Sequence, residues 1–210
     1  MRAAVLFSGG KDSSLSALLV SPHFDITLVT VTFGVEENWR TARRVAEKLG
    51  YPHEVIEMEE SVLGEITEIM LQDGNTRRGF NELHKRVIER VSEEFSVIVD
   101  GVRRDDIAPK LTIDEIRSIE SRRGIHYVSP LMGFSRKTVN LLVDKYFEIE
   151  EGKDLYVSDY EFELRRYMRG RGIDPMSLFP ENHIQSIVKE RKDRYGEENA
   201  RKKIETCKGI

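Results

Sequence analysis

The stretch Arg2-Ala3-Ala4-Val5-Leu6-Phe7-Ser8-Gly9-Gly10-Lys11-Asp12-Ser13-Ser14, followed by an apolar segment that runs to Val20, decides the fold of this chain. An apolar run comes first, and a loop with adjacent glycines and several hydroxyl side chains comes next. The second apolar segment has polar residues among its leucines. This order predicts a strand, a tight turn and a helix.

The turn of this unit, residues 8–14, has the chemistry of an anion site. Gly9 and Gly10 leave backbone N–H groups uncovered, and a helix that begins at Asp12 or Ser13 adds unpaired N–H groups and a positive dipole end. A plain glycine turn with Asp12 or Ser13 as the helix cap is the alternative. We favour the anion site because a strand is expected before the loop and a helix after it. The other donors of the loop are the hydroxyls of Ser8, Ser13 and Ser14 and the ammonium of Lys11.

Two familiar nucleotide-binding loops do not fit this spacing. A Walker loop that ends at Gly10-Lys11 needs a glycine where the chain has Val5 and a hydroxyl where it has Asp12, and G-x-G-x-x-G needs a third glycine. The segment Ser8-Gly9-Gly10-Lys11-Asp12-Ser13 resembles instead the S-G-G-x-D-S loop of the PP-loop ATP pyrophosphatases, also called adenine nucleotide alpha hydrolases.

This resemblance covers about residues 1–145 and is nearest to the tRNA-modifying and cyanodeazaguanine-synthase branches of the superfamily. In these enzymes the loop binds the pyrophosphate of ATP, and AMP is transferred to an oxygen of the substrate. The resemblance therefore implies that residues 8–14 bind ATP, with Mg²⁺ as its counter-ion. The end of the second strand borders the adenine in the superfamily, which implies a further ATP contact at Thr32 and Phe33.

Alternating patterns along the chain predict an α/β fold. We expect a parallel sheet of about five strands with helices on both faces, a flavodoxin-like three-layer arrangement of the adenine nucleotide alpha hydrolase type. Residues 1–150 would form the PP-loop ATP-binding domain and residues 151–210 a small helical C-terminal extension. The expected strands are residues 2–7, 25–33, 52–58, 96–100 and 125–128, and the expected C-terminal helices are residues 154–171 and 184–207.

A second motif, Gly101-Val102-Arg103-Arg104-Asp105-Asp106, follows the fourth expected strand and resembles the G-H-N-x-D-D signature of the superfamily. The resemblance implies that Gly101 contacts ATP and that Asp105 and Asp106 hold Mg²⁺, a hard cation that prefers oxygen ligands. Arg103 is a candidate for substrate contact, because a guanidinium binds phosphate through two N–H donors. The alternative is that Asp106 caps a helix and Asp105 is a surface charge.

Basic residues at two further places complete the expected site. The segment after the fifth expected strand resembles an element in which a lysine contacts ATP, and that role falls on Arg136 or Lys137. Arg77 and Arg78 resemble an arginine pair of the tRNA thiolation branch and would meet an anionic substrate, although the cysteine pair of that branch is missing here. A solvated helix start is the alternative reading at both places.

Composition narrows the classes of function. With 210 residues and a net charge of −4, the chain can bury one core, and nucleic acid is neither required nor excluded as a partner. The single cysteine, Cys207, excludes an intramolecular disulfide and a cysteine-based metal centre within one chain, and indicates a cytoplasmic setting. No apolar run approaches the roughly 20 residues of a membrane span, so no membrane partner is expected.

The expected activity is that of an AMP-forming ligase-type enzyme. A carbonyl or carboxylate oxygen of a tRNA base or a small metabolite would attack the alpha phosphorus of ATP, and a nitrogen or sulfur nucleophile would displace the adenylate. Lys11 and Arg136 or Lys137 would stabilise the developing charge, and Asp12 and Asp106 would place the metal or the loop.

The sequence also indicates partners for this activity and one alternative function. The chain has no N-terminal cysteine for a glutaminase, so ammonia would be free or come from a partner protein, and a partner could also donate sulfur. The tyrosine and arginine side chains of residues 154–171 would pack on the chain's own domain or in a homodimer, or else face RNA. The rival function is a non-catalytic sensor that binds adenine nucleotide and signals through its charged extension.

Overall fold

The fold is that of a five-stranded parallel sheet, seen in a computed structural model that describes residues 1–153, 155–179 and 184–192. The strand order is β3-β2-β1-β4-β5, so β1 (Arg2–Leu6) lies at the centre. β1 is flanked by β2 (Asp25–Thr32) and β4 (Val97–Val99), and the edge strands are β3 (His53–Glu57) and β5 (His126–Val128). This confirms the α/β parallel sheet that the sequence predicts.

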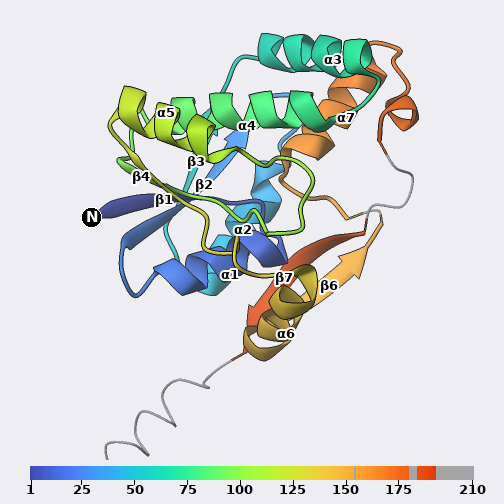
Figure 1. The fold of residues 1–210 in the computed structure, drawn as a ribbon. Helices are drawn as coiled ribbons and strands as arrows, with labels where there is room; N and C mark the ends of the chain where they lie inside the picture. The colour runs from blue at the N-terminus through green and yellow to red at the C-terminus, as the bar shows by residue number, and fades with distance from the viewer. Residues whose placement is uncertain (154, 180–183, 193–210) are drawn as a thin grey trace, which may run out of the picture.

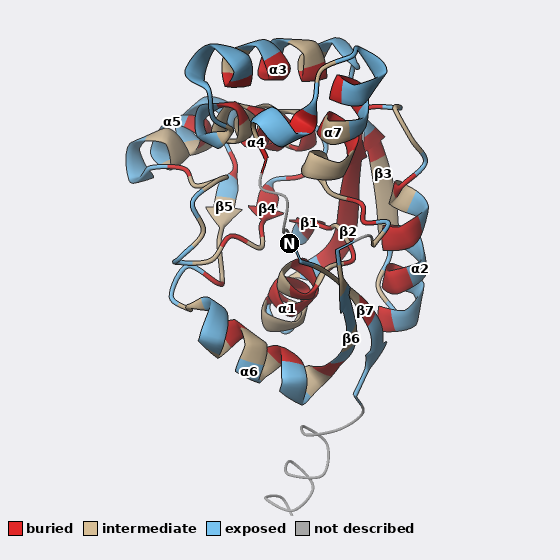
Figure 2. Ribbon diagram, turned by 90° about the vertical axis from the view of Figure 1, so that its right-hand side faces the viewer, coloured by how far each residue is buried: buried red, intermediate tan, exposed pale blue. Residues whose placement is uncertain are grey.

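Helices cover both faces of the sheet (Figure 1). One layer contains α3 (Ser61–Asp73), α4 (Arg77–Val91), α5 (Ile113–Arg123) and α7 (Tyr160–Gly170). The other contains α1 (Lys11–Val20), α2 (Trp39–Leu49), α6 (Arg136–Tyr146) and the short antiparallel sheet described below. Figure 2 shows the buried residues concentrated in the strands and on the inner faces of the helices.

The central strand explains why two separate cores form. Side chains alternate between the faces of a strand, so Ala4 and Leu6 join one hydrophobic cluster while Ala3 and Val5 join the other. All four are at most 8% exposed. A strand that is buried on both faces reads as a continuous apolar run, and this is why the first residues of the chain are so informative.

The C-terminal extension is not helical throughout, which corrects the sequence-based expectation. β6 (Phe147–Gly152) pairs antiparallel with β7 (Gln185–Arg191), and we refer to these two strands as the C-terminal ribbon. The helix expected over residues 154–171 begins only at Tyr160, and the described part of the helix expected over residues 184–207 is a strand. The ribbon forms because Phe147 and Val188 are buried in the cluster beneath the sheet.

Two further points of the sequence analysis concern Cys207 and a membrane span. Cys207 lies outside the described residues. Within the part of the chain that the structure describes, no helix combines the length and the apolar character needed to cross a bilayer.

Candidate functional site

The glycine loop lies between the end of β1 and the start of α1. The helix begins at Lys11, slightly earlier than predicted, and Gly10 is its N-cap without any side-chain hydrogen bond. Neither Asp12 nor Ser13 caps the helix, so the plain capping alternative is not realised. Gly9 has φ +78°, and a Cβ there would lie 3.2 Å from Val45 Cγ2, so the turn requires glycine for both reasons.

The loop is placed at the topological switch point of the sheet. The chain builds β2 and β3 on one side of β1 and then crosses to β4 on the other, so the segments after β1 and β4 meet at the carboxyl edge. The contact is close: a Cβ on Gly101 would lie 3.1 Å from the backbone nitrogen of Ser13. Glycine at position 101 therefore allows the two predicted motifs to pack against each other.

A polar cavity of about 290 Å³ opens over the loop. Its basic lining comes from Lys11, Arg103 and Arg136, which approach from three different parts of the chain. Ser8 and Ser13 add hydroxyl groups to the wall, and the backbone N–H groups of the first turn of α1 lie beside them. This combination of donors and positive charge suits a multiply charged anion.

A second cavity of about 210 Å³ shares Ser8, Asp12 and Ser13 with the first but is mainly apolar. Leu6 and Val31, from the ends of β1 and β2, line it beside polar residues of its floor. The loop thus forms the boundary between a basic cavity and an apolar cavity.

Asp12 lies on this boundary, and its carboxylate is poorly compensated by neighbouring groups. Its Oδ1 is buried and has no hydrogen-bond partner among the described residues, whereas Oδ2 lies 3.6 Å from the Arg103 guanidinium. Burial is the main cause of a raised pKa at Asp12; Arg103 opposes the shift and the charge of Asp106 adds to it. The Ser14 hydroxyl is likewise buried without a partner in the described chain. Unsatisfied groups of this kind are typical of binding sites.

The second motif supplies Arg103 and two carboxylates with different surroundings. Arg103 binds Asp106 at 2.5 Å, and Asp106 also accepts the Arg103 backbone N–H at 2.8 Å. Asp105 instead accepts the backbone N–H of Arg136 at 2.9 Å, a bond that lowers the pKa of Asp105. Asp106 therefore faces Asp12 and the apolar cavity, while Asp105 binds the backbone at the start of α6.

Of the two predicted Mg²⁺ ligands, Asp105 and Asp106, only Asp106 lines one of the two cavities. Asp106 lines the apolar cavity with Asp12, but Asp105 is engaged at α6 and lines neither cavity. No group of three or more histidine, cysteine, aspartate or glutamate side chains that could hold a metal ion occurs among the described residues. One or two carboxylates together with phosphate oxygens are nevertheless a usual set of ligands for Mg²⁺.

Thr32 and Phe33, the predicted adenine contacts, are not at the loop cavities. The Thr32 hydroxyl and the Phe33 backbone N–H each donate to the Glu163 carboxylate at 2.8 Å. Glu163 comes from α7 and is 1% exposed, and burial raises its pKa. Helix α7 therefore covers the end of β2, which the local sequence could not reveal.

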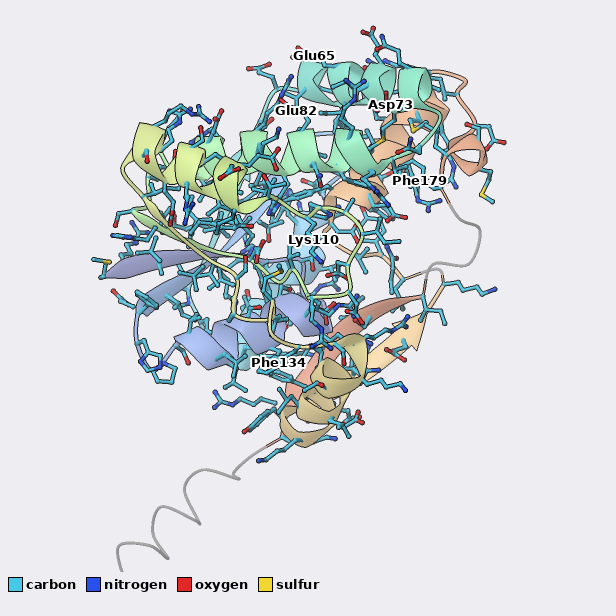
Figure 3. The ribbon with its side chains drawn as sticks, viewed as in Figure 1. Glu65, Asp73, Glu82, Lys110, Phe134 and Phe179 are labelled. Atoms are coloured by element: carbon cyan, nitrogen blue, oxygen red, sulfur yellow. The ribbon has the colours of Figure 1, made fainter. Side chains whose placement is uncertain are left out.

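Two of the predicted basic groups also lie away from the loop. Arg78 pairs with Asp73 at 2.7 Å, and Figure 3 labels Asp73 near the end of α3, in the helical layer on the face of the sheet opposite α1. Arg77 and Arg78 are exposed and line neither cavity, as expected for a solvated helix start. Arg136 and Lys137 are both exposed, but Arg136 lines the polar cavity and Lys137 lines neither cavity.

Sequence reasoning missed a buried polar cluster at the floor of the apolar cavity. His84 Nε2 lies 3.2 Å from Asp100 Oδ2 and 3.0 Å from the Tyr127 hydroxyl, which also donates to Asp100. Burial and the Asp100 charge raise the pKa of Tyr127. His84 Nδ1 has no partner in the described part of the chain. The only sequence signal was an acidic residue at the end of a buried strand.

Sequence reasoning also missed the residues of the C-terminal ribbon that lie at the loop. Gln185 and Ser186 line the polar cavity, and Glu151 binds the Lys11 ammonium at 2.6 Å. Nothing in the local pattern of the polar segments around them indicates this position.

Comparisons with known proteins agree with the fold. Residues 1–190 match a family model described as a family of unknown function, DUF7411. The uncharacterized protein MJ0690 of Methanocaldococcus jannaschii is 38% identical over 195 residues, which cover 90% of this chain and 96% of the relative. The crystal structure of a predicted subunit of tRNA methyltransferase from Methanocaldococcus jannaschii matches with a TM-score of 0.86 at 39% identity and covers 92% of this chain and 99% of that chain.

A more distant solved structure is the U34-tRNA thiolase NcsA of Methanococcus maripaludis with its [4Fe-4S] cluster. It matches with a TM-score of 0.47 at 17% identity and covers 69% of this chain and 55% of that chain.

Proposed function

The chain belongs to the DUF7411 family of unknown function, and from its site we propose that it is an ATP-using enzyme that forms AMP and pyrophosphate while it activates an acceptor. Its loop sequence resembles that of the PP-loop proteins, and its parallel sheet is the one that this resemblance predicts. The observation that carries the proposal is the position of this loop between a basic cavity and an apolar cavity.

ATP has a highly charged triphosphate and a largely apolar adenosine, which suit the polar cavity and the apolar cavity respectively. In our proposal the triphosphate lies in the polar cavity, where Lys11, Arg103 and Arg136 offset its charge and the first turn of α1 donates backbone N–H groups. The adenosine lies in the apolar cavity, against the ends of β1 and β2.

The residues present fit a Mg²⁺ ion that arrives with the nucleotide. Asp12 has a buried carboxylate oxygen without a partner in the described chain, and Asp106 lies close enough to raise its pKa. Asp12 lines both cavities and Asp106 lines the apolar one, so the two carboxylates would hold the ion at the boundary of the cavities, together with phosphate oxygens, since Mg²⁺ in phosphate sites is bound by few protein ligands. The ion would supply neutralisation of phosphate charge.

The chain's own residues would then orient the reactants. An oxygen of the acceptor forms a new bond to the alpha phosphorus, the bond from that phosphorus to the bridging oxygen breaks, and pyrophosphate leaves with the bonding electrons. Lys11 and Arg136 stabilise the negative charge on the departing pyrophosphate, and the loop amides hold it in line. No nucleophilic side chain is required for this step.

We propose a tRNA base as the acceptor, with a small metabolite as the competing class. The tRNA assignment is supported by the 39% identical relative, a predicted subunit of tRNA methyltransferase. Because that relative is a predicted subunit, we also propose a partner protein, which would provide the nitrogen or sulfur nucleophile. A thiolation that needs two cysteines of this chain is excluded, because its sequence has one cysteine.

The test is release of AMP and pyrophosphate from ATP and Mg²⁺, measured with and without total tRNA from the source organism. Asp12→Asn should reduce release by about a hundredfold or more, whereas Asp25→Asn, an equal change of charge at the exposed start of β2 and far from the carboxyl edge, should leave it unchanged. Release that depends on tRNA would support the tRNA acceptor.

Release that depends on a metabolite fraction instead of tRNA would move the acceptor to the small-molecule class. Tight ATP binding without AMP formation under any condition would contradict the enzyme and favour a nucleotide sensor. Absence of ATP binding would contradict both functions.

A further inference from the structure

The C-terminal ribbon contacts three consecutive residues of the glycine loop, Gly9, Gly10 and Lys11. The Val188 backbone N–H donates to the Gly9 carbonyl at 3.0 Å, and the Lys11 backbone N–H donates to Ser186 Oγ at 3.3 Å. A Cβ on Gly10 would lie 3.3 Å from the Ser186 carbonyl oxygen. The ribbon is therefore seated directly on the loop, although the two segments are far apart in the sequence.

The same ribbon provides the counter-ion of Lys11. Glu151 Oε1 lies 2.6 Å from Lys11 Nζ, and the side chain of Lys11 is only 9% exposed, against 45% for Glu151. A nearly buried ammonium needs an opposite charge, so this carboxylate stabilises Lys11 in the conformation that the structure describes. Any anion that binds the loop must compete with Glu151 for this ammonium.

Ser186 has hydrogen-bonding capacity that points to the same ligand. Its oxygen accepts the Lys11 backbone N–H, and its own O–H makes no hydrogen bond among the residues that the structure describes. A hydroxyl has one donor in addition to its acceptor lone pairs. Because Ser186 lines the polar cavity, this donor is available to an oxygen of a bound anion.

We propose that the C-terminal ribbon is one wall of the phosphate site. Ser186 donates its O–H to a phosphate oxygen, and Glu151 is the carboxylate that the bound phosphate displaces from Lys11. The inference rests on the proposed binding of ATP and adds to it two binding-site residues from outside the PP-loop motifs.

Replacement of Glu151 by phosphate at the Lys11 ammonium would link ligand binding to the contacts between the ribbon and the loop. When phosphate takes the place of Glu151, that carboxylate loses its counter-ion and turns to solvent, which weakens one of the contacts that hold β6 against the loop. The backbone bond from Val188 to Gly9 remains, so the ribbon stays anchored through β7. Pyrophosphate should show the same exchange as ATP, because only the phosphates are involved.

The experiment measures binding of pyrophosphate and of ATP with Mg²⁺ to the full chain by titration calorimetry at one ionic strength. Glu151→Gln removes the competitor and should tighten both ligands by about threefold to tenfold, the range expected for an ion pair whose carboxylate is partly exposed to solvent. Ser186→Ala should weaken both by about tenfold, because a donor to a charged oxygen is lost. Ser186→Thr keeps the hydroxyl and should bind almost as the natural chain does.

Glu150→Gln is the matched control. Glu150 precedes Glu151 in β6, pairs with Lys189 on the surface of the ribbon, and its substitution changes the net charge by the same amount. Its affinities should equal those of the natural chain, which separates displacement at Lys11 from general electrostatic attraction.

The outcomes distinguish this inference from the proposed function. If the natural chain binds neither pyrophosphate nor ATP, the proposed function fails. If the natural chain binds them and Glu151→Gln fails to tighten binding while Ser186→Ala equals Ser186→Thr, the ribbon is a structural support and the inference is overturned. If Glu151→Gln does not fold, as thermal melting would reveal, the two Ser186 variants decide the question.

Discussion

Asp12 combines a cost to stability with a position suited to function. Its pKa is raised in the folded state, mainly by burial, so folding disfavours the ionised carboxylate that predominates at neutral pH. Chains retain such groups where binding requires them, and the stability that is lost can be recovered by substitution. The residue was predicted from the loop motif, but its unsatisfied oxygen could be found only in the structure.

Asp12→Asn should therefore gain stability while it loses ATP turnover by about a hundredfold or more. Because the pKa of Asp12 in the folded chain lies above the ordinary value of an aspartate, the ionised carboxylate destabilises the fold increasingly as the pH rises from that ordinary value toward the raised one. We expect the variant to be about 1 kcal/mol more stable at pH 7, allowing for partial solvent screening, and to show little difference near pH 3. Urea unfolding at both pH values measures this, and a variant less stable at pH 7 would contradict it.

His53 should make the fold sensitive to acid. Burial, with a smaller contribution from Arg43, lowers the pKa of His53 to about 4, while Thr30 Oγ1 lies 2.8 Å from its Nε2. The unfolded chain binds the proton more readily, so stability is unaffected above about pH 6.5 and falls as the pH decreases toward 4.

His53→Gln should remove this component, which we put at about 1–2 kcal/mol after allowance for partial exposure. Unfolding by urea at pH 7.0 and pH 4.5 gives the comparison between the natural chain and the variant. An equal loss of stability in both proteins would show that other groups cause the acid sensitivity. Titration of the His53 ring by NMR provides the direct check of its pKa.

At the level of elements, α7 stabilises the end of β2 through Glu163. Glu163→Ala would leave the Phe33 N–H and the Thr32 hydroxyl without their acceptor inside the core, and we expect a loss of about 2–3 kcal/mol in the free energy of unfolding. Glu163→Gln keeps one acceptor oxygen and should lose less. Chemical denaturation of both variants beside Glu190→Ala, an exposed change in β7, tests the order; equal stabilities would contradict it.

Elements with local signals were predictable from the sequence, and those held by distant partners were not. The capping box of α5 is an example of the first kind: Thr112 accepts the Glu115 N–H at 3.2 Å and its own N–H donates to Glu115 at 2.8 Å. The ribbon is an example of the second, because β6 and β7 carry charged residues that read as solvated and become strands only through mutual pairing. For the same reason the loop residues were candidates for the site from the sequence alone, whereas Glu151, Ser186 and Glu163 were not.

In the molecule as a whole, the C-terminal segment contributes to both cores. Leu164 and Met168 are fully buried in the cluster above the sheet, and Phe147 and Val188 are at most 2% exposed in the cluster below it. Burial of each such side chain contributes about 1.5–3 kcal/mol. Together these contributions are comparable with the entire stability of a typical domain, about 5–15 kcal/mol.

We therefore predict that the full chain unfolds in one cooperative transition, and that a chain ending at Tyr146 does not fold cooperatively. Differential scanning calorimetry tests the first statement by comparing the calorimetric and van't Hoff enthalpies, which should agree. Two separate transitions, or a stable fragment of residues 1–146, would instead support the division into an independent ATP-binding domain and an extension that the sequence suggests. In the cooperative case, a ligand that binds the glycine loop should raise the single melting temperature, because loop, ribbon and both cores then unfold together.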